Sequence, residues 1–185
     1  MRTLAITQNM TLDGAVEMLD DWFDPTQQDP DHLTELHRQD ATCDAVLLGR
    51  QTFEAFRGYW PEQSDDQTGV TDQLNTVTKY VVSSTMTDPR WQNSVVLSGD
   101  LLQEVRALKE QPGQDIVATG SIMVCHELLT ADLVDECRIF VHPAVQGRGR
   151  RFFPEGFAAS RLRLLDHKTF GNGVTYLGYG LTQEH

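Results

Sequence analysis

Apolar and polar positions along the chain follow two different periods. Short runs that are apolar throughout, or that alternate with polar residues, predict β-strands. Up to about Leu129 these runs are separated by segments with helical spacing, so strands and helices alternate. The predicted strands in this part are Thr3–Gln8, Ala45–Leu48, Lys79–Ser83, Ser94–Leu97 and Asp115–Thr119.

The clearest helix is predicted over Asp100–Glu110. Its leucine and valine positions form one stripe, Asp100 can cap the first turn, and Pro112–Gly113 end the helix. Two polar stretches, Asn9–Pro30 and Arg57–Thr71, are predicted to be irregular, and loops of that length in compact domains are often functional. Further helices are predicted over Asp31–Ala41, Gln51–Phe56 and Ser121 to about Leu129.

The last part of the chain consists of strands. Leu133–Val141 has the pattern of a strand, and Val145–Gly156 is a loop rich in glycine and arginine. Arg161–Phe170 and Val174–Leu181 flank Gly171-Asn172-Gly173, which is a strong hairpin signal. This order of elements predicts a single α/β domain over residues 1–185. We expect a central mixed, mainly parallel sheet, flanked by helices and extended by a C-terminal antiparallel hairpin.

Composition narrows the chemistry. Of the 185 residues, 39% are hydrophobic and 23% are charged, which is ordinary for a globular domain. No apolar run can span a bilayer, and the first ten residues lack the apolar stretch of a secretory signal. We therefore expect a cytoplasmic protein with no membrane partner. The 3 cysteines form no CxxC pair and the 6 histidines form no HExxH pattern, so we expect buried thiols and no metal site.

Charge limits the partners further. The formal net charge is −12, from 15 basic and 27 acidic residues, which argues against a nucleic-acid partner or an anionic membrane surface. The acidic excess gathers between Asp13 and Asp40. Arginines crowd a later stretch, at Arg148, Arg150, Arg151, Arg161 and Arg163. Solvated surface explains both groups, and an anionic ligand near the arginines is the alternative.

Three predicted strands each end in a small or polar turn that opens a helix. They lie in Leu47–Phe56, Val81–Thr85 and Ala118–Leu129. Because helix N-termini present unpaired backbone N–H groups, such turns suit phosphate. Each is ordinary turn chemistry when taken alone, but together their order and spacing predict a site for a long anionic cofactor. The first strand is not followed by a GxGxxG turn, which argues against a Rossmann dehydrogenase.

The turns and several other segments resemble known families. The cofactor-binding turns of the dihydrofolate-reductase-like fold are similar to Gly49–Glu54, Val82–Thr85 and Thr119–Ile122. The reductase domain of riboflavin biosynthesis is more similar in Leu12–Gly14, Asp132–Ile139 and His142–Gly147. The HxE and PCxxC zinc motifs of the deaminase that often accompanies that domain are absent from the sequence, so a stand-alone reductase is expected.

The resemblance implies NADPH as the cofactor. Its phosphates would meet Gly49, Arg50, Gln51 and Thr52. The adenosine and its 2′-phosphate would lie near Ser83, Ser84 and Thr85. The pyrophosphate and nicotinamide side would lie along Gly120, Ser121 and Ile122. Glycine lets the backbone approach phosphate closely, and this chain has Gly-Ser where the folate enzymes usually have Gly-Gly.

Two acidic residues are the catalytic candidates. The resemblance places Asp13, beside Gly14, in a loop over the nicotinamide that shields hydride transfer from water. Asp31 resembles in position the active-site carboxylate of the folate enzymes, which would protonate the substrate as hydride arrives. A simple turn at Asp13 and N-capping by Asp31 are the alternatives, and water is another proton source. Glu35 is no better supported as the acid.

The sequence therefore predicts an NADPH-dependent reductase that transfers hydride to a C=N or C=O bond. Its small-molecule substrate would be heterocyclic, a riboflavin-pathway pyrimidine or else a pterin or folate. A non-catalytic nucleotide- or ligand-binding or regulatory protein on the same fold is the alternative. The resemblance also implies a homodimer through the late strands, with a sheet edge near Leu133–Val141 that needs covering. Aromatic loop residues would stack on the heterocycle or else belong to the peripheral core: Trp22, Phe23, Tyr59 and Trp60.

Overall fold

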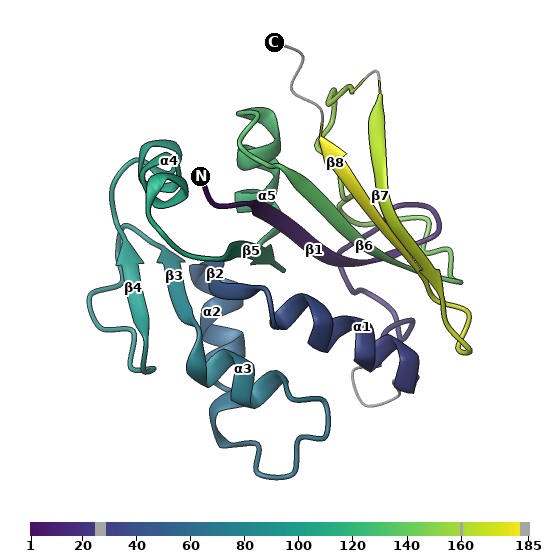
Figure 1. Ribbon diagram of the computed structural model, residues 1–185, viewed down its shortest axis with the longest axis horizontal. Coiled ribbons are helices and arrows are strands. Elements are labelled where there is room, and N and C mark those ends of the chain that lie inside the picture. The colour runs from purple at the N-terminus through teal and green to yellow at the C-terminus, as the bar shows by residue number, and fades with distance from the viewer. Residues whose placement is uncertain (25–28, 160, 182–185) are drawn as a thin grey trace.

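The computed structural model describes residues 1–24, 29–159 and 161–181, which form one sheet with helices packed on both faces (Figure 1). The strands are β1 (Leu4–Thr11), β2 (Cys43–Gly49), β3 (Thr78–Val82), β4 (Ser94–Leu97), β5 (Asp115–Thr119), β6 (Glu136–His142), β7 (Leu162–Thr169) and β8 (Thr175–Leu181). The helices are α1 (Pro30–Asp40), α2 (Arg50–Arg57), α3 (Val70–Thr76), α4 (Leu101–Glu110), α5 (Ile122–Thr130) and the short 3-10 helix η1 (Trp60–Glu62).

Within the described residues the sheet has the strand order β4-β3-β2-β5-β1-β6-β8-β7. The strands from β4 to β6 in this order are all parallel, and β8 and β7 continue the sheet as an antiparallel hairpin. Parallel neighbours need crossover connections, whereas an antiparallel pair needs only a tight turn. The predicted fold class is confirmed, including the hairpin at the C-terminal end.

The alternation of side chains along β2 separates two hydrophobic cores. Ala45 and Leu47 point to the larger core, which also contains the buried stripes of α4 and α5. Val46 and Leu48 point to the opposite face, where α2 and α3 pack. Because successive residues of a strand face opposite sides of a sheet, one apolar run supplies both cores.

Aspartates cap two of the helices. Asp100 accepts a hydrogen bond from the backbone N–H of Gln103 and begins α4, as predicted. At α1 the capping residue is Asp29, whose carboxylate accepts from the backbone N–H groups of Asp31 and His32 at 2.9 and 3.3 Å. Asp31 is therefore not the N-cap, since Pro30 already occupies the first helical position and Asp31 follows it.

Two parts of the predicted element map are wrong. The Arg57–Thr71 stretch holds η1 and the start of α3, a helix of 7 residues that buries Thr71 and Leu74. A helix that short is stabilised by packing and not by its own propensity, so the local pattern is weak. The Leu133–Val141 segment is not a sheet edge, because β6 lies between β1 and β8.

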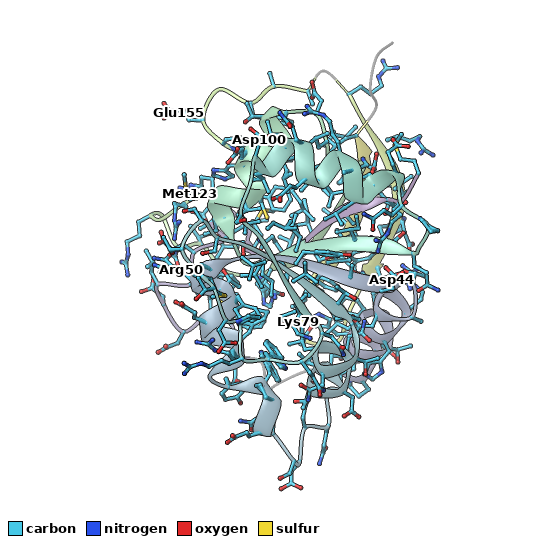
Figure 2. The ribbon with its side chains drawn as sticks, turned by 90° about the vertical axis from the view of Figure 1, so that its left-hand side faces the viewer. Asp44, Arg50, Lys79, Asp100, Met123 and Glu155 are labelled. Atoms are coloured by element: carbon cyan, nitrogen blue, oxygen red, sulfur yellow. The ribbon has the colours of Figure 1, made fainter. Side chains whose placement is uncertain are left out.

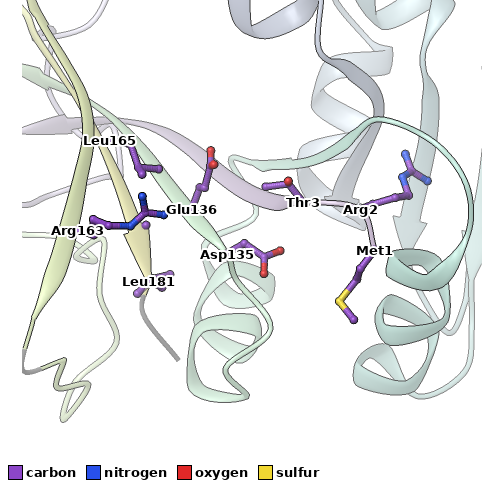
Figure 3. Close-up of a pocket in the computed structure, with 9 residues that line it drawn as sticks. Met1, Arg2, Thr3, Asp135, Glu136, Arg163, Leu165 and Leu181 are labelled. Atoms are coloured by element: carbon purple, nitrogen blue, oxygen red, sulfur yellow. The ribbon is translucent and has the colours of Figure 1, made fainter. Parts of the chain in front are cut away.

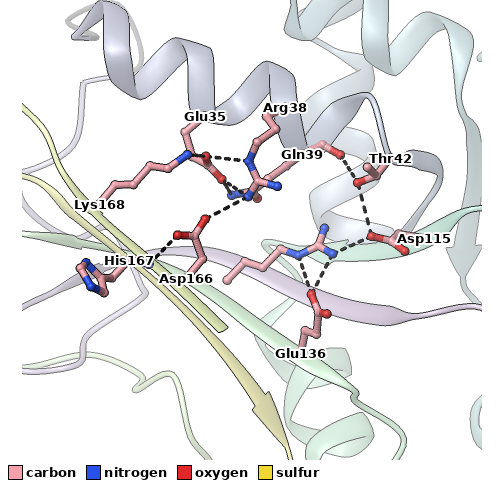
Figure 4. A network of polar contacts seen from close by, with 10 residues as sticks. Glu35, Arg38, Gln39, Thr42, Asp115, Glu136, Asp166, His167 and Lys168 are labelled. Carbon is pink, nitrogen blue, oxygen red and sulfur yellow. Dashed lines mark hydrogen bonds and ion pairs between the residues drawn. The ribbon is translucent and has the colours of Figure 1, made fainter. Parts of the chain in front are cut away.

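A network of charged and amide groups ties α1 to the hairpin (Figure 4). The buried carboxylate of Glu35 is contacted by Arg38 and Gln39 from its own helix and by Lys168 from β7. Arg38 also reaches Asp166 on β7, at 3.5 Å. Helix α1 is thereby held over β6 and β8, where Leu36 packs against the cluster that contains Phe140 and Tyr176.

Candidate functional site

A cavity of about 1000 Å³ opens on the face of the sheet that carries α1, α2 and α3. Its floor is formed by side chains of the central strands, among them Thr7, Asn9, Val46, Val117 and Phe140. Helix α1 forms one wall, and α2, η1 and α3 form the other. The cavity therefore lies between the hydrophobic core under α2 and α3 and the aromatic cluster under α1.

Two of the three predicted cofactor turns meet at the mouth of this cavity. The turn after β2 and the turn after β5 are adjacent because these strands pair in parallel. The backbone N–H of Gly49 donates to Ser121 Oγ at 2.7 Å, and the N–H of Ser121 donates to Thr52 Oγ1 at 2.9 Å. Arg50 and Met123, the latter from the first turn of α5, lie on the same side of the molecule in Figure 2, and both line the cavity.

Both helices that open at the mouth begin without a side-chain cap. Gly49 precedes α2 and Ser121 precedes α5, and neither supplies a side-chain hydrogen bond to its own helix. The first-turn N–H groups of a helix have no partner within the helix, and its dipole favours negative charge there. Two such helix starts side by side are suited to a pyrophosphate.

The Gly120-Ser121 pair has a backbone that side chains rarely adopt. Gly120 has φ of +63°, and a Cβ built there would lie 2.6 Å from Thr52 Cγ2. Ser121 also has a positive φ, of 28°, although it is not glycine. Its hydroxyl and its N–H are both used in tying the two turns together, which explains how a serine is held where the folate enzymes usually have a second glycine.

The third predicted turn lies at the same edge of the sheet, and of its residues Val82 lines the cavity whereas Ser83, Ser84 and Thr85 do not. Ser83 is buried, and its hydroxyl accepts hydrogen bonds from the N–H groups of Thr85 and Met86, so it stabilises its own turn. Ser84 and Thr85 are exposed. The guanidinium of Arg50 reaches Thr85 Oγ1 at 3.5 Å, which connects this turn to the start of α2.

Neither predicted catalytic aspartate lines the cavity. Asp31 is exposed on the first turn of α1. Asp13 accepts hydrogen bonds from the Thr11 hydroxyl and from the backbone of Gln146 and Gly147. These bonds, with that from Thr11 the strongest, hold the pKa of Asp13 well below its ordinary value, so this carboxylate is a poor proton donor.

The acidic and the arginine-rich stretches of the sequence pair with each other. Ion pairs join Asp13 to Arg151, Glu17 to Arg150, and Asp20 to Arg148, at 2.9, 2.8 and 2.6 Å. A β-bridge between Ala15 and Arg151 aligns the two loops. These arginines therefore already contact carboxylates of the chain itself, which weakens the interpretation that they bind an anionic ligand.

The family comparison agrees with this geometry. The family model of the RibD C-terminal domain matches residues 2–176. The chain belongs to the RibD C-terminal domain family. A separate comparison with curated proteins finds a relative, the uncharacterized protein YyaP of Bacillus subtilis (strain 168), which is 30% identical over 181 residues, covering 96% of this chain and 94% of YyaP. The predicted resemblance to the riboflavin-biosynthesis reductase domain is confirmed at the level of the family.

Solved structures show the fold of this RibD-type domain. A putative riboflavin biosynthesis protein from Shewanella sp. PV-4 matches with a TM-score of 0.71 and 18% identity, over 98% of this chain and 99% of that chain. Dihydrofolate reductase from Enterococcus faecalis, in a complex with NADP(H), matches with a TM-score of 0.67 and 19% identity, over 98% of this chain and 97% of that chain. The dihydrofolate-reductase-like fold is confirmed.

Aromatic and polar side chains complete the cavity of the RibD-type domain. Phe23, Tyr59 and Trp60 line it, as the stacking interpretation requires. Trp22 does not, because its indole N–H donates to Gln146 Oε1 and its ring packs against His142. The polar lining that the sequence reasoning missed consists of Thr7, Gln8, Asn9, Gln39, Asp40 and Gln73.

The two acidic residues in the second half of α1 have opposite environments. Burial raises the pKa of the Glu35 carboxyl, but hydrogen bonds from Arg38, Gln39 and Lys168 outweigh it and hold the pKa at about 2. Glu35 faces that network and not the cavity (Figure 4). Asp40 lines the cavity, and its burial raises its pKa. The sequence signal that could have identified Asp40 is its position at the end of the predicted helix, just before a buried strand.

A second hollow, of about 300 Å³, lies at the other end of β1 and β6 (Figure 3). It is lined mainly by polar groups, including Arg2, Asp135, Glu136 and Arg163. Asp135 is paired with Lys109, and Glu136 with Arg138. Because the cofactor turns follow the carboxyl ends of the parallel strands, this hollow is separate from the candidate site.

The three thiols of the RibD-type domain are buried, and burial keeps them protonated. Burial raises the pKa of Cys43 to about 11 and the pKa values of Cys125 and Cys137 to about 12, so thiolate is scarce at neutral pH. Among the described residues, no three His, Cys, Asp or Glu side chains lie together so as to hold a metal ion. None of the helices in the described ranges has the length and apolar character to cross a bilayer.

Proposed function

We propose that this protein is an NADPH-dependent reductase that transfers hydride to a C=N or C=O bond of a heterocyclic substrate. The observation that carries the proposal is the meeting of two uncapped helix starts, α2 and α5, at the mouth of one large cavity. Membership of the RibD C-terminal domain family supports it. NADP(H) bound to the Enterococcus dihydrofolate reductase supports the choice of cofactor on this fold.

The residues at the mouth fit a dinucleotide. First-turn N–H groups of α2 and α5, including those of Gln51 and Thr52 and of Met123, would hold the pyrophosphate. The absent Cβ at Gly120 leaves the backbone open to close approach, since any side chain there would collide with Thr52. When bound, the nicotinamide supplies the hydride, while the protein supplies orientation and a cavity from which water is excluded.

The adenosine end of the cofactor is assigned to the exposed turn after β3. Ser84, Thr85 and the guanidinium of Arg50 are exposed and adjacent there, and they would bind the 2′-phosphate. Ser83 would act through the turn that its hydroxyl stabilises. Asp13 would hold its loop over the mouth by its bonds to Gln146, Gly147 and Arg151.

The proton that follows the hydride is assigned to water. Asp31 stays a prediction from resemblance, and its exposed position on α1 does not support it. Apolar side chains from the walls, Phe56 and Leu74, and from the floor, Val117, favour a flat heterocycle stacked on Phe23 or Trp60. Hydride transfer is favoured in such a site because few waters compete for the substrate.

The test is titration of the purified chain with NADPH and NADH, followed by oxidation assays with heterocycles. The Gly120→Ala substitution places a methyl group 2.6 Å from Thr52 Cγ2. Thr52 cannot easily turn away, because its hydroxyl accepts a hydrogen bond from the backbone N–H of Ser121. We expect NADPH binding to weaken about tenfold or more, because the phosphate-binding backbone must shift. Unchanged affinity would remove this turn from the site.

Gly156→Ala is the matched control. Gly156 also has a positive φ, of +78°, but nothing lies within 4 Å of a Cβ built there. It carries the same backbone penalty without the collision, so NADPH affinity should stay at the wild-type value. Binding of neither NADPH nor NADH to the wild type would refute the proposed reductase. NADPH binding without oxidation by any heterocycle would favour the alternative, a nucleotide-binding or regulatory protein.

A further inference from the structure

The cavity extends well beyond the turns assigned to the cofactor. Asp40 at the end of α1 and Cys43 at the start of β2 line one end, and Gly49–Thr52, from the last residue of β2 into α2, line the other. A strand of seven residues, as β2 is, spans roughly 20 Å. The end formed by Gln39, Asp40, Cys43 and Gln73, called the inner end below, is therefore free for a part of the substrate.

The two glutamines at the inner end have fixed orientations. Gln39 Nε2 donates at 2.8 Å to Glu35, an ionised carboxylate that can only accept, so the amide nitrogen must face it. Gln73 Nε2 donates to the carbonyl oxygens of Asp40 and Cys43, at 3.2 and 3.4 Å, which also only accept. The amide nitrogen of each side chain thus faces acceptors of the chain itself, and within the described chain no hydrogen bond reaches either amide oxygen.

The carboxylate of Asp40 adds a third acceptor. No donor from the described residues contacts it, and the charge that favours its ionised form is His37, which itself contacts the Thr68 carbonyl oxygen. The Cys43 thiol donates to the Ala45 carbonyl oxygen and offers the cavity nothing. Arg138 pairs with Asp115 and Glu136 through Nε and Nη2, and although its buried Nη1 has no partner among the described residues, Arg138 does not line the cavity.

The mouth of the cavity does not offer a free arginine cluster either. Arg150 is the one of the three loop arginines that lines the cavity, and Glu17 accepts hydrogen bonds from its backbone N–H, Nε and Nη2 atoms. A phosphate ester would have to displace that carboxylate. Donor groups on a ligand could bind the amide oxygens of Gln39 and Gln73 and the carboxylate of Asp40 at the inner end without displacing a group of the chain.

We infer that the inner end binds N–H donors, so that the substrate carries an amino or amidinium group at the end far from the hydride-accepting bond and no phosphate ester there. This inference rests on the proposed function and narrows its substrate class. It separates the candidate substrates by the group that each places at the inner end: amino or ring N–H groups complement these acceptors, whereas a phosphate ester there would not. Asp40 is the residue that determines this specificity, with Gln39 and Gln73 beside it.

The test compares three ligands that share one ring: benzamidine, which only donates, benzoate, which only accepts, and phenyl phosphate. Each is titrated into the full chain by calorimetry, with NADPH titrated separately. We expect benzamidine to bind about tenfold more tightly than the two anions, and Asp40→Asn to remove that preference. NADPH affinity of Asp40→Asn should equal that of the wild type, because the cofactor turns lie at the other end of β2.

Asp72→Asn is the control, since Asp72 is an exposed carboxylate on α3 beside Gln73 and should leave benzamidine binding unchanged. If Asp40→Asn fails to melt cooperatively, Asp40→Ala replaces it, since it removes the carboxylate without breaking a side-chain hydrogen bond among the described residues, and it should likewise abolish the preference for benzamidine. Equal or tighter binding of either anion, no binding of benzamidine, or benzamidine binding indifferent to the Asp40 substitution overturns the inference. Failure of the proposed function shows instead as wild-type protein that binds no NADPH.

Discussion

Ser121 connects the turn after β5 to the end of β2 and the start of α2 through two hydrogen bonds. Its hydroxyl accepts from Gly49 at the end of β2, and its N–H donates to Thr52 in α2, although it precedes α5. A non-glycine residue with φ of 28° is strained, and such strain persists where the surroundings determine it. The strained residue lies at the mouth of the cavity, where two helix starts must be held in register.

Lys79 is the other residue with an unusual environment. It is fully buried, with Nζ donating to the carbonyl oxygens of Leu74 and Val77 and lying 4.7 Å from the centre of the Trp91 ring (labelled in Figure 2). Burial lowers its pKa from 10.5 to about 8. The neutral amine keeps two N–H donors for the same two carbonyl oxygens.

Because burial lowers the pKa of Lys79, we predict that the free energy of unfolding increases in mild alkali. Below pH 8 the lysine is charged in both states and the burial penalty is fully present. Between about pH 8 and 10.5 the unfolded chain binds more protons, so the free energy of unfolding rises with pH, by about 3 kcal/mol across the window. Urea unfolding at a series of pH values checks this, with Lys79→Met lacking the rise. Parallel curves for the two proteins would contradict it.

At the scale of elements, the loop after β1 is held over the cavity by its partner loop. Backbone bonds join the two loops, including Val16 N–H to Arg150 O at 3.0 Å, and ion pairs flank them. Exposed pairs contribute little to global stability. Their effect is therefore expected in local opening of the loop and not in the melting temperature.

Glu17→Gln should loosen this loop without unfolding the domain. Three donors of Arg150 converge on the Glu17 carboxylate and hold its pKa below the ordinary value. We expect amide hydrogen exchange at Gly14 and Val16 to become about threefold faster. Glu127→Gln, an exposed change on α5, is the control and should leave exchange at these amides unaltered. Faster exchange throughout the sheet would instead mean a loss of global stability.

At the scale of the whole molecule, the sheet changes character at β6. The parallel part is covered by helices on both faces, whereas the hairpin leaves β7 at the edge with Leu164 and Leu165 exposed. A register shift between Leu164 and Asp166 interrupts the pairing of β7 with β8 there. Long edge strands with apolar side chains are usually covered.

The predicted homodimer through the late strands is therefore assigned to β7 and not to β6. Light scattering after size exclusion should give twice the chain mass of 20.8 kDa, and Leu164→Lys should give the monomer mass. A charge at an edge disfavours pairing with another strand. Val95→Lys, at an exposed position of the opposite edge strand β4, should leave the dimer intact. A wild-type monomer would contradict the assignment.

Most of the fold follows from local pattern, but the roles of single acids do not. The strands around Ala45–Leu48 and Asp115–Thr119 were predictable because short apolar runs bounded by turn residues favour buried β-strands. The positions of the turns that follow them are then fixed by the strands. The expectation that Asp13 and Asp31 contact the substrate is not supported, because neither lines the cavity. The direction of a side chain depends on packing between distant segments, which a local pattern does not show. Asp40 went unnoticed for the same reason.

The sequence by itself determined the α/β fold, the strand-turn-helix units and the hairpin, since these arise from periodicity and turn chemistry within a few residues. Tertiary structure alone decided that α1 lies against the hairpin, that the acidic and basic loops neutralise each other, and that acceptors gather at the inner end. These depend on contacts between residues far apart in the chain, such as Glu35 with Lys168 and Glu17 with Arg150, which no local pattern encodes.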